Sequence, residues 1–274
     1  MSDCEALQES SRFVRDWFRR QPAVKEESLT DWLLFDISQK IPRVTYRAFS
    51  HHEEARQTGA DWEWWFLFSS FAFKMRVQAK KLKPSEDHYP GIAHTNQHGL
   101  QIEKLLHDAH QTNSMPFYAF YTVETAEVMC RMGRNDEGVF MAEGHRIHGD
   151  VIAVPRRRID SSDVLKHTIA LSCFLCCPLA LGKVAEPGLD PGDRGYAWSR
   201  FMREYFGSGL TQSLSDGEDL DSTIPGVHRQ IPSYVRSFVE AGEEGVPDWW
   251  EKEFHHDIEG IGALVVYDGR ERPE

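Results

Sequence analysis

The clearest structural signal in this chain of 274 residues is the stretch TGADWEWWFLFSSFAFKMRVQAKKLK at residues 58–83. Aromatic and β-branched residues dominate the stretch, and a pair of serines interrupts them at positions 69 and 70. This composition is typical of β-strands broken by a tight connection. We therefore predict two strands, at residues 61–68 and 73–79, paired as a hairpin.

Three side chains of this hairpin are expected to converge. Side chains alternate between the two faces along a strand, so Gln78 and Lys80 lie on one face and Ala79 lies on the other. Asp61, at the start of the preceding strand, can meet the first two at the same edge of the sheet. The pattern therefore predicts one site that contains an aspartate, a glutamine and a lysine.

The segments on either side of the hairpin indicate the fold class. Apolar residues at helical spacing predict two helices before it, around residues 13–18 and 29–37. VTYRAF at 44–49 predicts another strand, and a helix around 100–106 and a strand at 117–123 follow the hairpin. The order helix, three strands, helix, strand predicts an α/β protein with a mixed central sheet flanked by helices.

Beyond about residue 135 the signal breaks into shorter helical and strand-like segments. The last of them, GALVVYD at 262–268, predicts a strand that brings the chain back to the same body. We therefore expect a core at residues 1–134 and a mixed α+β extension at residues 135–274 that packs on it. Residues 186–195 and 213–221 are candidate boundaries within the extension.

Charge is unevenly distributed along the chain. The net charge of −12 argues against a surface broadly covered with phosphate-binding groups, because non-specific affinity for nucleic acid comes from clustered lysine and arginine. The segment FKMRVQAKKLK at 73–83 is nevertheless locally basic, whereas acidic residues gather at 213–222 and 240–245. A protein of this kind can be acidic overall and basic at its binding groove.

The sequence predicts a cytoplasmic protein with no membrane partner. Its first twenty residues carry charges where a signal peptide needs an apolar segment, and no apolar run reaches membrane-spanning length. Five cysteines are few and odd in number, which favours reduced thiols over a disulfide framework. Cys173 and Cys176 have the spacing of half a zinc knuckle, but no second pair accompanies them, so we interpret them as buried structural cysteines.

Asp61, Gln78 and Lys80 are suited to the hydrolysis of a phosphodiester. Carboxylate and amide oxygens can bind Mg²⁺ or Mn²⁺, and such a metal polarises a phosphate and lowers the pKa of a bound water. The ammonium of Lys80 can stabilise the negative charge that develops in the transition state. These residue types therefore favour a metal-dependent nuclease.

The same motifs, Gly-Ala-Asp at 59–61 and Gln-Ala-Lys at 78–80, resemble the PD-(D/E)xK nuclease superfamily over about residues 25–123, and in particular its Mrr-like variant with Gln-x-Lys. The chain also resembles an uncharacterised bacterial family with the motifs Glu-Ser-x-Thr-Asp, Thr-Gly-Ala-Asp-Trp-Glu-Trp and Val-Gln-Ala-Lys. The resemblance implies a restriction-endonuclease-like core that cuts DNA, with RNA as a further option. It also implies a role in defence against phage or other foreign DNA, as a homodimer or within a larger defence complex.

The resemblance assigns roles to individual residues. Asp61 matches the metal-binding acid and Lys80 the lysine, whereas Gln78 stands in place of the second acid and could bind a metal only through its amide oxygen. A glutamate from the first core helix would complete the metal site. The family pattern selects Glu27, whereas helical spacing places Glu26 on the inward-facing stripe.

Two further side chains are candidates for the same site. Glu63 follows Asp61 by two residues and hence lies on the same strand face, where it could be another ligand or support the ligands. Gln101, at the start of the next helix, could orient a water or contact a phosphate.

Other interpretations of these residues remain open. The hairpin charges can form an ordinary solvated face, and Arg156–Arg158 can either contact phosphate or lie on a plain surface. Gln78 and the negative net charge also fit a nuclease-derived module that no longer cuts and instead binds nucleic acid or a protein partner. A third interpretation is an acidic C-terminal half that binds a basic protein. The chain lacks Gly-x-Ser-x-Gly, Walker and dinucleotide motifs, which argues against those enzyme classes.

Overall fold

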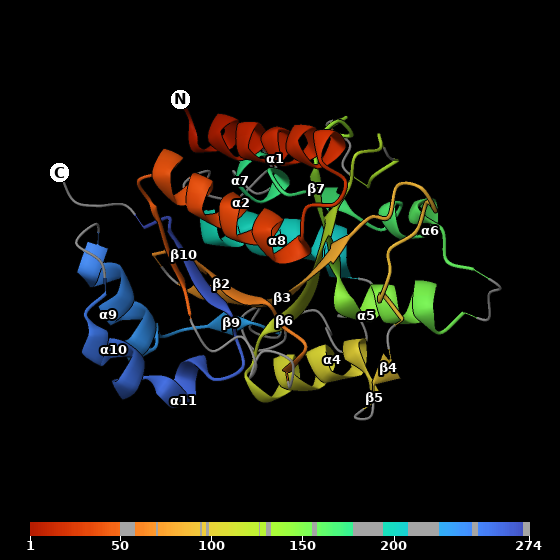
Figure 1. Cartoon of the computed structure of the whole chain (residues 1–274). Coiled ribbons are helices and arrows are strands. Elements are labelled where there is room, and N and C mark those ends of the chain that lie inside the picture. Colours follow the sequence, from red (N-terminus) through yellow and green to blue (C-terminus); the bar gives the residue numbers. More distant parts are fainter. Residues whose placement is uncertain are drawn as a thin grey trace, which may run out of the picture.

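The computed structural model describes residues 1–49, 58–69, 71–93, 95–96, 99–125, 127–129, 133–154, 158–177, 194–207, 225–242 and 246–270. The fold is α/β, with a mixed central sheet of parallel and antiparallel strands flanked by helices (Figure 1). The strands are β1 (Val44–Ala48), β2 (Trp62–Leu67), β3 (Ala72–Lys81), β4 (Thr95–Asn96), β5 (Gly99–Leu100), β6 (Met115–Tyr121), β7 (Val139–Glu143), β8 (Ile169–Ala170), β9 (Val227–His228) and β10 (Ala263–Asp268).

The main sheet has the strand order β1-β10-β2-β3-β6-β7-β8, and β9 pairs with one end of β3. The pairs β10–β2 and β3–β6 are parallel, and the other pairs are antiparallel. The predicted hairpin is confirmed as β2 and β3, with Glu63 opposite Arg76 and Trp65 opposite Lys74. Strands β4 and β5 form a small separate sheet.

Strand β10 lies between β1 and β2, although it is the last strand of the chain. Its residues pair with β1 on one side and with β2 on the other. Strands β7 and β8 extend the opposite edge of the same sheet. The expected division between residues 134 and 135 therefore does not correspond to a division of the sheet, because strands from both parts pair within it.

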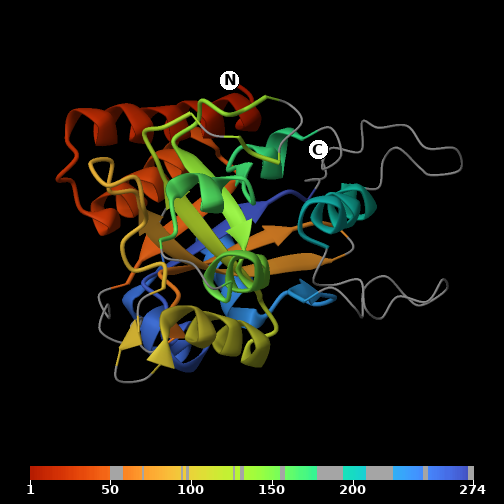
Figure 2. The ribbon, with the colours of Figure 1, turned by 90° about the vertical axis from the view of Figure 1, so that its right-hand side faces the viewer.

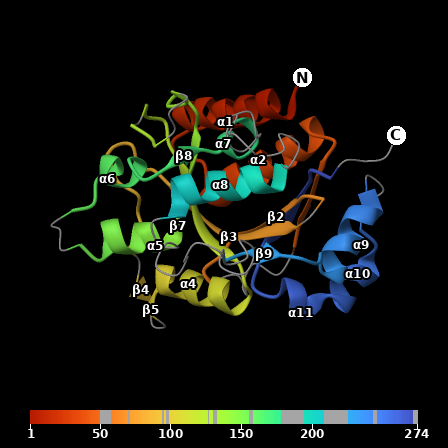
Figure 3. The ribbon, with the colours of Figure 1, turned by 180° about the vertical axis from the view of Figure 1, so that it is seen from behind.

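Helices cover both faces of the sheet. Helices α1, α2, α7 and α8 lie on one face, and α4, α9, α10 and α11 lie on the other (Figures 1 and 3). Figure 2, turned by 90°, shows α1 and α2 on the opposite side of the sheet from α4. The helices are α1 (Asp3–Arg20), α2 (Glu26–Lys40), α4 (Gln101–Gln111), α5 (Gly144–Ile147), the π-helix η1 (His148–Ile152), α6 (Ser161–Leu165), α7 (Cys173–Cys176), α8 (Arg194–Phe206), α9 (Ser233–Ala241), α10 (Asp248–Glu253) and α11 (His255–Ile258).

The two faces of the sheet have different chemistry. On the face of α7 and α8, Phe66 packs against Phe174 and Trp198, with ring centroids 5.7 Å and 5.2 Å away. Burial of such aromatic rings is a main source of stability in a core of this size. On the face of α4, strand β3 instead presents four polar side chains at alternate positions: Lys74, Arg76, Gln78 and Lys80. Because side chains alternate along the strand, one face of β3 is apolar and the other carries buried charged and polar groups.

One prediction about the cysteines is wrong. Cys4 of α1 and Cys176 of α7 form a disulfide, with their Cα atoms 5.1 Å apart, whereas the sequence favoured reduced thiols throughout. The two cysteines are 172 residues apart, and only the packing of α7 beside α1 brings them together. Cys173 and Cys177 are buried and take no part in this disulfide, and Cys130 lies outside the described residues.

Within the described ranges, no helix combines the length and the apolar composition that crossing a membrane requires.

Candidate active site

Asp61 lies at the start of β2, where its backbone is held by the strands on both sides. Its N–H donates to the carbonyl of Val77 in β3, and its carbonyl accepts the N–H of Gly262 just before β10, both at 2.8 Å. The preceding Gly59 has φ +76° and packs against α4. A Cβ atom at Gly59 would lie only 2.9 Å from the carbonyl oxygen of Gln101. This close approach fixes Asp61 beside the first turn of α4.

A continuous chain of hydrogen bonds links Lys80 to Asp61. The Lys80 ammonium donates to Gln101 Oε1 at 3.0 Å, and Gln101 Nε2 donates to Gln78 Oε1 at 2.8 Å. Gln78 Nε2 then donates to Asp61 Oδ2 at 2.6 Å, and the backbone N–H of Ala79 donates to the same oxygen at 2.6 Å. The amides of Gln101 and Gln78 thus connect the Lys80 ammonium to the Asp61 carboxylate. Each hydrogen bond fixes the orientation of an amide and polarises the hydrogen bond that follows it.

Glu26, in the first turn of α2, lines the same pocket as Asp61 and Gln101. Its carboxylate accepts the backbone N–H of Lys81, so it is held at the end of β3. Burial raises the pKa of Glu26 to about 7, the charge of Asp61 acts in the same direction, and the charge of Lys80 opposes them. Glu27 is exposed, and its carboxylate is therefore more weakly constrained than that of Glu26.

These residues surround a pocket of about 340 Å³. Glu26, Glu27, Asp61, Ala79 and Gln101 line it. The other lining residues are Thr30 and Asp31 of the Glu-Ser-x-Thr-Asp motif, and Lys25, Gly262 and Ala263, which the sequence did not point to. Gln78 and Lys80 lie behind this lining and are only 3% and 5% exposed. No local pattern could have indicated Gly262 and Ala263, because the pairing of β10 with β2 brings them there.

Glu63 does not join Asp61, although the two residues share a strand face. Its carboxylate is fully buried and lies 3.1 Å from both the Lys74 ammonium and Arg76 Nε. Burial alone would raise the pKa of Glu63, but these two cations lower it below its ordinary value. Glu63 therefore belongs to a second polar cluster, because its side chain is drawn to the cations directly across the hairpin. The sequence placed Glu63 beside Asp61 as a further metal ligand or as a support for the ligands, whereas the structure places its carboxylate with Lys74 and Arg76.

The model of a protein family described as "Family of unknown function (DUF6615)" matches residues 3–268 of the chain. The chain belongs to that family. The matched range includes every residue of the site and extends through β10. No curated protein matches the chain.

The donor set of this DUF6615 site is limited for a metal. Among the described residues, no three His, Cys, Asp or Glu side chains are grouped so that they could hold a metal ion. The carboxylates of Glu26, Glu27, Asp31 and Asp61 nevertheless line one pocket, and the charge of Asp61 raises the pKa of Glu26. One or two carboxylates, with waters and substrate phosphates, form a common donor set for Mg²⁺. The residues present therefore fit Mg²⁺ or Mn²⁺ without a third acid.

Gln78 is oriented as a partner of Asp61. Its amide nitrogen faces the carboxylate, and its amide oxygen faces Gln101. To act as a metal ligand beside Asp61, Gln78 would have to turn its amide over and give up both hydrogen bonds. In this arrangement Gln78 positions Asp61.

Of the remaining candidates of the sequence, Arg158 is described and does not line the pocket. Arg158 forms a 2.9 Å ion pair with Asp160, and Arg156 and Arg157 lie outside the described residues. The acidic segment 213–222 also lies outside them.

Proposed function

We propose that this protein is a metal-dependent nuclease that hydrolyses phosphodiester bonds in DNA. The observation that carries the proposal is the convergence of Asp61, Gln78, Lys80, Gln101 and Glu26 around one pocket. Carboxylates that line one pocket, with a buried lysine behind the lining, suit a reaction that binds a cation, activates water and builds up negative charge on phosphate oxygens.

The residues have distinct roles in this proposal. Asp61 and Glu26 hold Mg²⁺ or Mn²⁺, with Glu26 preferred to Glu27 because it is the more buried and the more firmly held. When bound, the metal supplies Lewis-acid activation of the phosphate and of a water. Gln78 and Gln101 keep Asp61 and Lys80 in their places, and Lys80 contributes positive charge to the transition state.

The order of elements supports a restriction-endonuclease-like core. Helix α2, strands β1 to β3, helix α4 and strand β6 follow one another in the order that the resemblance implies. Asp61 comes from the start of β2 and Gln78 and Lys80 come from β3, as in the motif hairpin of that superfamily. DNA as the substrate, a role in defence and assembly into a dimer or larger complex rest on the resemblance alone.

The proposal is tested by incubating plasmid, linear and single-stranded DNA, and RNA, with the protein and Mg²⁺ or Mn²⁺. We expect metal-dependent cleavage that falls by at least about 100-fold in Asp61→Asn and in Lys80→Ala. Lys83→Ala is the matched control, because Lys83 is exposed and pairs only with Glu86 among the described ion pairs. Cleavage that survives both site substitutions would indicate a contaminating enzyme and would overturn the assignment.

A second comparison separates the two glutamates. Glu26→Gln should abolish most of the cleavage, because the proposal assigns a metal-binding role to Glu26. Glu27→Gln should retain the cleavage, and it is the matched control because it makes the same substitution at the neighbouring position of α2. The reverse result would assign the metal to Glu27.

A nuclease-fold module that binds nucleic acid or a protein partner without cutting is the second candidate. The observation that favours it is the hydrogen-bond chain itself, which already connects Asp61 and Lys80 through two amides. Folded wild-type protein that cuts none of the four substrates with either metal, yet retards one of them in a binding assay, would select this candidate.

A further inference from the structure

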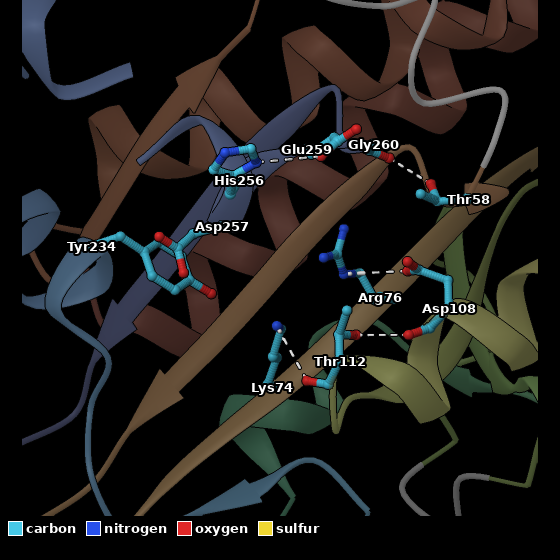
Figure 4. Close-up of a pocket in the computed structure, with 10 residues that line it drawn as sticks. All are labelled: Thr58, Lys74, Arg76, Asp108, Thr112, Tyr234, His256, Asp257, Glu259 and Gly260. Carbon is cyan, nitrogen blue, oxygen red and sulfur yellow. Dashed lines mark hydrogen bonds and ion pairs between the residues drawn. The ribbon is translucent and has the colours of Figure 1, made fainter. Parts of the chain in front are cut away.

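A second pocket, of about 420 Å³, lies on the same face of the sheet between α4, α9 and α11 (Figure 4). Thr58 lines this pocket, whereas Asp61 lines the first. Between them, the Gly59 backbone is packed against Gln101 and Leu105 of α4. The packed backbone of Gly59 therefore separates the two pockets. A ligand can bind in the second pocket without contacting Asp61.

Arg76 forms the floor of this second pocket and is only 2% exposed. Its Nε lies 3.1 Å from Glu63 Oε2 and 3.5 Å from Asp108 Oδ2. Its terminal nitrogen Nη1 is buried and has no hydrogen-bond partner within the described part of the chain. Figure 4 shows the two terminal nitrogens of Arg76 turned away from Asp108. A buried guanidinium N–H without an acceptor is costly, so its presence indicates that something else supplies one.

Lys74 adds a second cation to the same floor. Its side chain is 7% exposed, and its ammonium lies 3.1 Å from Glu63 and 3.4 Å from the carbonyl oxygen of Thr112. Burial lowers the pKa of Lys74 and raises that of Asp108, because both charges have lost much of their hydration. The carboxylates of Glu63 and Asp108 lie at Nε of Arg76, so Nη1 is the atom that can still take an acceptor.

The rim of the pocket is acidic and limits what can enter. Asp257 and Glu259 line it and are exposed, together with His256, whose Nδ1 lies 3.9 Å from Glu259 Oε2. Such a rim repels a polyanion such as nucleic acid but can accept hydrogen bonds from hydroxyl or amino groups. A pocket of this volume is of the size that holds small molecules.

We propose that this pocket binds a small molecule through an oxyanion, either a carboxylate or a phosphate monoester, held by Nη1 of Arg76 and the ammonium of Lys74. Hydroxyl or amino groups of the same molecule face Asp257 and Glu259. An arginine fork with a neighbouring lysine is a common arrangement for binding either oxyanion.

The test is calorimetric titration of the full chain with inorganic phosphate and, separately, with acetate, in EDTA and at constant ionic strength. We expect saturable binding of one of the two with one site per chain, and the anion that binds identifies the head group. Arg76→Lys should weaken that binding by at least about tenfold, because it keeps the charge and removes the fork. Lys80→Ala should leave it unchanged, which separates this pocket from the site of the proposed nuclease.

A pair of surface variants keeps the test decisive if Arg76→Lys fails to fold. Glu259→Lys places a cation at the rim, and Glu253→Lys makes the same charge change at an exposed position of α10 outside the pocket lining. Glu259→Lys should tighten the binding by about threefold or more, and Glu253→Lys should have a much smaller effect. The proposal would be overturned if neither anion saturated the wild type. It would also be overturned if Glu259→Lys and Glu253→Lys changed the anion affinity equally.

Discussion

Gln78 differs from an acidic residue at the same position because its amide both donates and accepts. It accepts from Gln101 and donates to Asp61, so the chain of hydrogen bonds from Lys80 is complete with no metal present. A carboxylate at this position would face the carboxylate of Asp61 across the same 2.6 Å contact. Two such groups could not both be ionised without a cation between them.

The first prediction concerns Gln78→Glu. Without metal the variant should be less stable than the wild type by about 2 kcal/mol, because a hydrogen bond is replaced by repulsion. Mg²⁺ should restore that loss, so the rise in Tm on adding Mg²⁺ should be larger than in the wild type. Thermal unfolding of both proteins with and without Mg²⁺ measures this difference. Gln111→Glu, at an exposed position of α4, makes the same charge change and should show no extra dependence on Mg²⁺.

The second prediction concerns the pH dependence of stability. Burial, opposed by Lys80 and reinforced by Asp61 and Glu27, raises the pKa of Glu26 from 4.5 to about 7. Protonated Glu26 is therefore favoured in the folded chain. Its contribution to the free energy of unfolding is fully present below pH 4.5 and is lost as the pH rises through about 7. The loss amounts to at most about 3 kcal/mol.

Urea unfolding between pH 4.5 and 8 measures this contribution. Stability of the wild type should fall across that interval, and Glu26→Gln should remove part of the fall. Glu27→Gln should reduce the fall only slightly, because Glu27 makes the smallest contribution to the raised pKa of Glu26. Some slope should remain in Glu26→Gln, because burial also raises the pKa of Glu137 to about 7. Parallel curves for Glu26→Gln and the wild type would rule out a raised pKa at Glu26.

At the scale of elements, the contact between the turn at Gly59 and helix α4 sets the position of β2 relative to that helix. Gly59→Ala should reduce stability by more than about 1 kcal/mol, because φ is +76° and the new Cβ would lie 2.9 Å from Gln101 and 3.1 Å from Leu105. Denaturant unfolding measures the loss. Gly149→Ala is the matched control, since a Cβ there meets nothing within 4 Å, and it should be close to neutral. Equal stability of the two variants would mean that the turn can move away from α4.

The elements that could be predicted are those whose signal is local. Alternation and aromatic content identified β2 and β3, and helical spacing identified α2 and α4, so the neighbours Asp61, Gln78 and Lys80 could be placed together. Glu63 obeyed the same alternation, but its partners are cations that the strand pairing and α9 enclose. Short elements such as α5 and α11 are four residues long and carry too little periodicity to be recognised.

At the scale of the whole molecule, the disulfide between Cys4 and Cys176 joins segments that are 172 residues apart. Reduction should lower the free energy of unfolding by about 2–4 kcal/mol, because a long loop gains freedom in the unfolded chain. Thermal unfolding with and without dithiothreitol tests this. Cys4→Ser should unfold at the temperature of the reduced wild type and should not respond to dithiothreitol. A response in that variant would mean that another pair of thiols carries the effect.

The arrangement of the sheet also explains why its full order was beyond sequence patterns. The segment at 262–268 was recognisable as a strand, but its place between β1 and β2 depends on competition among all strands for partners. Pairings between distant segments have no local signature. The same competition decides which residues complete the rim of the Asp61 pocket.

The position of β10 has a consequence for the time course of synthesis. A ribosome makes Asp61 and Lys80 long before it makes Gly262 and Ala263. The pocket needs Gly262 and Ala263 in its lining, and the N–H of Gly262 donates to the Asp61 carbonyl. A nascent chain, or one shortened by a premature stop codon, therefore has an open gap between β1 and β2 and an incomplete pocket. If the protein cuts DNA, the cell that makes it is not exposed to that activity until translation has passed the last strand.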